Sequence, residues 1–143
     1  MAAEVDIILK WISETNIQAA LIGPLVTGVG YLIHRHVSKK KGLAELIQEI
    51  ELAATEHWCS PAGDEVNRWR CIQLQHKFKT LGWKINQKDS EHRNALTAYR
   101  KAVTGDDFDS PDRQLIPYED TRIELISEKA KSLRRVLKIS KNY

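Results

Sequence analysis

The hydrophobic pattern of this chain is dominated by one uncharged run, residues 17–33. An apolar run of this length that holds no ionisable acid or base except Tyr31 predicts a single membrane-spanning helix. At about 1.5 Å per residue it reaches roughly 25 Å, less than the roughly 30 Å of a hydrocarbon core. We therefore expect a thin membrane, or basic side chains that snorkel to the surface, to complete the span. Residues 1–16 predict a short amphipathic segment before it.

The charges on either side of this run differ in sign. Residues 1–16 are net acidic, whereas residues 34–41 contain four cations and no acid. Basic residues beside a span are retained in the cytoplasm. The predicted orientation is N-terminus outside and C-terminus cytoplasmic, with a bacterial inner membrane as the default location.

Residues 42–143 show helical periodicity instead. A first stripe consists of Leu43, Leu46, Ile50, Ala53 and His57. Ser60 then suggests a cap and Pro61 a first helical residue. The helix that follows is expected to run to about Leu81, with apolar positions at Val66, Trp69, Ile72, Leu74, Phe78 and Leu81. Gly82 is expected to end it, with Trp83 and Ile85 packing back on the bundle.

Two more helices follow. One is expected to open at Asp89 or Ser90 and to end before Gly105, and a polar loop then leads to Pro117. The last carries a regular stripe of Ile123, Ile126, Ala130, Leu133 and Leu137. Because no segment alternates with a period of two, the sequence predicts an all-α chain, in which an N-terminal transmembrane helix precedes a small antiparallel bundle of about four helices.

Composition supports one folded domain after the span. The chain is 42% hydrophobic and 29% charged, with a net charge of +3. The excess of cations lies beside the span and in the final helix, where a solvated helix end explains part of it. The second interpretation of these cations is that they bind anionic lipid headgroups. The residues expected to contact the headgroups are Arg35, Lys39, Lys40, Lys41, Arg134, Arg135 and Lys138. Nucleic acid is disfavoured because no exposed aromatic residue or recognition helix is evident.

Small residues recur on one face of the uncharged run. Ala19, Gly23 and Thr27 are spaced by four, which is the small-xxx-small pattern of helix self-association in membranes. This face is a candidate contact between two copies of the chain.

No catalytic, cofactor-binding or metal site is expected. Cys59 and Cys71, with His57 and His76, lack the close cysteine pair that structural zinc sites use, so two separate reduced thiols are predicted. The acidic loop after Gly105 lacks the spacing of a calcium loop.

These observations predict a non-enzymatic, single-pass membrane protein that presents a helical protein-interaction module at the cytoplasmic face. Its expected partners are the lipid bilayer and an unidentified protein or a second copy. Two alternatives remain open: a small oligomerising, membrane-active protein of the pore, lysis or toxin kind, and a soluble all-α adaptor in which residues 17–33 form a buried core helix.

Overall fold

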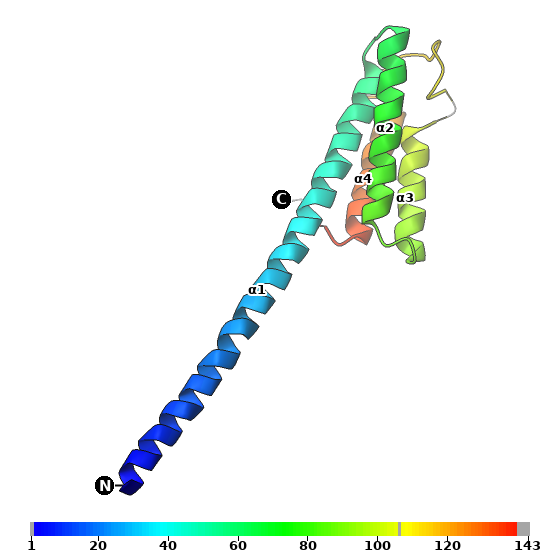
Figure 1. Ribbon diagram of the computed structural model, residues 1–143. Helices are drawn as coiled ribbons and strands as arrows, with labels where there is room; N and C mark the ends of the chain where they lie inside the picture. The colour runs from blue at the N-terminus through cyan, green and yellow to red at the C-terminus, as the bar shows by residue number, and fades with distance from the viewer. Residues whose placement is uncertain (1, 106, 140–143) are drawn as a thin grey trace. The chain divides into compact units, whose positions relative to one another are not determined.

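A computed structural model describes the backbone of residues 2–105 and 107–139, and the side chains from residue 26 onward within those ranges. The described backbone holds four helices and no strand: α1 (Ala2–Cys59), α2 (Asp64–Lys84), α3 (Ser90–Val103) and α4 (Thr121–Val136) (Figure 1). The predicted all-α class is confirmed. The chain divides into two compact units, Met1–Lys39 and Lys40–Tyr143.

The first unit is helical and exposes apolar side chains. Five of them, at positions 26, 29, 31, 32 and 33, are between 53% and 66% exposed. Over the part of the chain that the structure describes, no helix carries a stretch long and apolar enough to cross a bilayer. This finding does not support the predicted span over residues 17–33; side chains 17–25 of that segment lie outside the described residues.

The second unit is an antiparallel bundle that begins with the C-terminal part of α1. Glu56 and Glu49 of α1 form ion pairs with Arg70 and Lys77 of α2, in the order expected for helices that run in opposite directions. At the other side of α1, Glu51 contacts Arg134 of α4. The four helices enclose one core, formed by residues such as Ile47, Ile50, Leu74, Leu81, Tyr99, Ile126 and Leu133.

Polar contacts join helices that are far apart in sequence. The Tyr99 hydroxyl donates to the Ile47 carbonyl at 3.2 Å, which ties α3 to α1, and the Tyr99 ring meets Phe78 of α2 edge to face. The Trp58 indole donates to the Val103 carbonyl at 3.0 Å. These contacts tie α3 to α1 and α2 across the core.

The start of α2 differs from the sequence expectation. The Ser60 amide completes α1 by donating to the Glu56 carbonyl, so Ser60 is not a cap and Pro61 lies outside any helix. The helix begins after Gly63, with Asp64 and Glu65 in its first turn. Acidic side chains are favoured there by the helix dipole.

The end of α2 also differs, because Gly82 does not terminate it. The helix continues to Lys84, and the Ile85 amide donates to the Leu81 carbonyl. A Cβ at position 82 would lie 3.4 Å from Gln87 Nε2 and 3.8 Å from the Leu96 side chain, which are ordinary van der Waals distances. The prediction for α3 was accurate: Asp89 caps it by accepting from the Glu91 and His92 amides.

Candidate functional site

The two ends of the bundle carry opposite charge. One end consists of the start of the second unit, the turn between α2 and α3, and the end of α4 (Figure 1). We call it the basic end. It holds five lysines and fewer acids among the described residues. The acids are Asp89, which is engaged as the α3 cap, Glu91 in the first turn of α3, and Glu45, which pairs with Lys41 at 4.0 Å. The lysines are Lys40, Lys41, Lys84, Lys88 and Lys138.

The opposite end, formed by the α1–α2 turn and the loop from residue 104 to 120, is acidic. Its described carboxylates are Asp64, Glu65, Asp107, Asp109, Asp112, Glu119 and Asp120. Two arginines beside them are held inward: Arg113 is buried, and the Arg122 guanidinium lies 4.1 Å from the centre of the Trp58 ring. The bundle is therefore polarised along its length.

The lipid-contact residues predicted from the sequence fall into three groups. Lys40, Lys41 and Lys138 lie at the basic end, and Arg35 and Lys39 are exposed in the first unit. Arg135 is exposed on α4. Arg134 instead donates to a Glu51 carboxylate oxygen at 3.0 Å along the side of the bundle.

The predicted self-association face is only partly described. Ala19 and Gly23 lie outside the described side chains, while Thr27 is described and exposed. Lys84 and Lys88 of the basic end, and Trp83 beside them, were not among the contact residues predicted from the sequence.

The Trp83 side chain is 72% exposed and does not pack back on the bundle, contrary to the prediction. The Lys79 ammonium lies 5.1 Å from the centre of its ring. Ile85 does pack inward and is buried. Because Gly82 continues the helix, Trp83 takes a position on the outer face of α2 while Ile85 takes the inward one.

Other apolar positions predicted on α2 are also exposed. Val66, Trp69 and Ile72 lie on the outer side of the helix, with Trp69 at 59% exposure. Of the apolar positions predicted on this helix, Leu74, Phe78 and Leu81 are the ones that lie in the core. Two exposed tryptophans also remove the absence of aromatics as an argument against nucleic acid.

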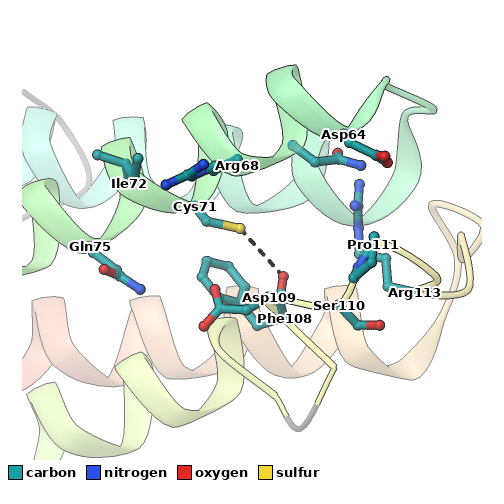
Figure 2. A pocket seen from close by; sticks show the side chains of 11 residues that line it. Asp64, Arg68, Cys71, Ile72, Gln75, Phe108, Asp109, Ser110, Pro111 and Arg113 are labelled. Atoms are coloured by element: carbon teal, nitrogen blue, oxygen red, sulfur yellow. Dashed lines mark hydrogen bonds between the residues drawn. The ribbon is translucent and has the colours of Figure 1, made fainter.

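A buried polar cluster closes the acidic end. The Phe108 carbonyl accepts from His57 Nε2 at 3.1 Å. It also accepts from the Cys71 thiol at 3.4 Å (Figure 2). Arg113 donates through two of its nitrogens to the His57 carbonyl, at 2.6 and 3.1 Å. These bonds anchor the long loop onto α1 and α2, because each of them joins the loop to a helix.

A cleft of about 380 Å³ lies beside this cluster, between α2 and the loop (Figure 2). Arg68, Asp64 and Asp109 line it together with Cys71. Burial and the nearby Asp109 carboxylate raise the pKa of the Cys71 thiol to about 11. At neutral pH this thiol stays protonated, so it is a poor nucleophile and a poor metal ligand.

Both cysteines are free thiols, as predicted. Burial, reinforced by the carboxylates of Asp120 and Glu119, raises the pKa of Cys59 as well. Among the described residues no group of three or more His, Cys, Asp or Glu side chains is placed to hold a metal ion.

The buried His57 is held in its neutral form. Burial and then the charge of Arg113 lower its pKa from 6.5 to about 4. Its Nε2 proton is used for the Phe108 carbonyl, and its Nδ1 has no hydrogen-bond partner in the described part of the chain. A second proton would therefore be buried without an acceptor.

Comparison with known proteins gives no relative: no family model, curated protein or solved structure matches this chain.

Proposed function

We propose that this chain is a non-enzymatic membrane protein whose N-terminal segment holds a helical interaction module at the cytoplasmic face of a bilayer. The observation that carries the proposal is the exposure of the apolar side chains at positions 26–33 of α1. Apolar side chains of this size are normally buried, and a contiguous exposed set marks a surface that a membrane or partner covers.

The charges that follow this segment favour a membrane as the cover. Arg35 and Lys39 are exposed, and the bundle that begins at Lys40 has its basic end there. Cations beside an apolar segment interact with anionic headgroups and remain on the cytoplasmic side.

The bundle itself is suited to protein contact. Its α2 helix presents Val66, Trp69 and Ile72 to solvent, and exposed tryptophan is typical of interface hot spots. The buried thiol, the neutral His57 and the inward-held Arg113 serve the fold.

Extraction of membranes with alkaline carbonate tests the tether. We expect the full-length chain to stay in the pellet. Replacing Val26 and Val29 together by Asp should release it, because both lie nearer to the middle of residues 17–33 and each charge at the centre of a spanning helix costs about 2.5–3.5 kcal/mol. A matched variant with Asp at Leu52 and Val66, which are exposed in the bundle, should remain in the pellet.

Release of the unaltered chain by carbonate would contradict the proposal. If the released chain were monodisperse without detergent, the soluble adaptor would be the better account. If the retained chain made vesicles leak a trapped dye, and Gly23→Leu abolished the leak, the membrane-active alternative would replace the interaction module.

A further inference from the structure

We infer that the basic end of the bundle docks directly on an anionic bilayer, with Trp83 as an interfacial anchor and Lys84 and Lys88 as headgroup contacts. The inference rests on the proposed function and adds the residues and the lipid class that the bundle recognises.

Trp83 has the chemistry of an interfacial residue. Tryptophan is enriched at the membrane–water interface because one end of the indole is apolar and its N–H is polar. Trp83 has the most exposed side chain among the large apolar residues that the structure describes, at 72%. It lies next to the end of α2, immediately before Lys84.

Cations surround Trp83. The shallow groove beside it is lined by Lys79, Arg93 and Arg100 and contains no acidic residue in its lining. Lys84 and Lys88 add two exposed cations at the adjoining turn. The Lys84 ammonium also lies 3.9 Å from the Cβ position at Gly42, so it is close to the start of the bundle.

The basic end is continuous in sequence with the proposed tether. The bundle begins at Lys40, within the cationic flank of residues 34–41 and shortly after the apolar run that ends at Ile33, so a run held in a bilayer keeps Lys40 close to the headgroups. The acidic end, with its carboxylates, is unsuited to an anionic surface. An acidic protein partner could use the same cations, but it would not require them to gather at the end where the chain leaves the bundle.

The α2 helix supplies a matched control. Trp69 is 59% exposed on the same helix, but it lies near the acidic end, about one turn after Asp64 and Glu65. A docked basic end leaves Trp69 in water while Trp83 reaches the headgroup layer. A comparison of the two tryptophans therefore distinguishes docking of the basic end from nonspecific binding of exposed aromatic side chains to the bilayer.

The test uses the full-length chain reconstituted in vesicles of phosphatidylglycerol and phosphatidylcholine with brominated acyl chains, which quench nearby indoles. We expect Trp83→Phe to lower the quenched share of the tryptophan fluorescence and Trp69→Phe to leave that quenched signal in place. The Trp83 contribution should be absent in vesicles of phosphatidylcholine alone. Lys84→Gln with Lys88→Gln should weaken docking by roughly fivefold for each lysine.

Equal effects of the two tryptophan substitutions, or no effect of Trp83→Phe, would overturn the inference. Quenching of Trp83 that persists in phosphatidylcholine would also overturn the role of the lysines. Carbonate extraction keeps the two proposals separate. A chain retained in the pellet without Trp83 quenching has a tether but no docking, whereas a released chain with quenching docks without a tether.

Discussion

Acidification should destabilise the bundle through His57, because the folded state resists the proton that the unfolded chain accepts. The pKa of His57 is lowered from 6.5 to about 4 on folding. Above about pH 6.5 both states are neutral and the stability is complete; as the pH falls toward 4, only the unfolded state gains the proton. At about pH 5 the linkage relation gives a loss of about 2 kcal/mol.

The environment of His57 explains the sign. Arg113 and Arg70 disfavour the imidazolium, and Asp109 and the Phe108 carbonyl favour it too weakly to offset them and the burial. A loss of about 2 kcal/mol is a large part of the roughly 5–15 kcal/mol that stabilises a typical domain.

The assay is urea unfolding of the full-length chain in a non-ionic detergent, followed by circular dichroism. It compares about pH 7.5 with about pH 5 in the wild type and in His57→Gln. The glutamine amide can still donate to the Phe108 carbonyl, but it cannot titrate. The variant should lose about 2 kcal/mol less than the wild type over this interval.

An equal pH dependence in the two proteins would refute the reasoning. If the variant does not fold, a nuclear magnetic resonance titration of the wild-type histidines tests the prediction instead. It should show one histidine that stays neutral at about pH 5. Titration of every histidine near its ordinary pKa would contradict the buried, neutral state.

Three further predictions concern single contacts. Tyr99→Phe removes the bond to the Ile47 carbonyl and leaves that carbonyl buried, so urea unfolding should show a loss of about 1–2 kcal/mol. Iodoacetamide should modify Cys59, which is partly exposed, faster than Cys71, which is buried and has a pKa raised to about 11; mass spectrometry of tryptic peptides measures both rates, and equal rates would contradict the packing at the acidic end. Asp89→Ala removes the α3 cap and should cost about 1 kcal/mol, whereas Asp89→Asn should restore most of it, as urea unfolding of both variants checks.

The helices could be predicted where local signals agree with packing. In α4, the heptad spacing placed Ile126, Ala130 and Leu133 inward, and all three are fully buried. Asp89 before a periodic segment identified the start of α3. Spacing and capping are local properties, so a single sequence carries them.

The basic end could not be predicted from the sequence, because its lysines come from different helices and share one end only in the folded bundle. Lys40, Lys84 and Lys138 are distant in the chain and meet only because the helices alternate in direction. Gly82 is a local signal for helix termination, but α2 continues through it to Lys84, which leaves Trp83 outside instead of inside.

The polar cluster at the acidic end was missed for a related reason. Arg113 donates to the carbonyl of His57, which is 56 residues away in the sequence. No local sequence pattern near either residue predicts that hydrogen bond. His57 itself was placed correctly on the inward stripe, and it is fully buried.

Protease protection in sealed inside-out inner-membrane vesicles tests the central claim most directly, because it reads attachment and orientation together. The account predicts that added trypsin digests the bundle and leaves a membrane-held fragment that carries residues 17–33. Release of the whole chain on washing, or a bundle that trypsin reaches only after detergent is added, would contradict it.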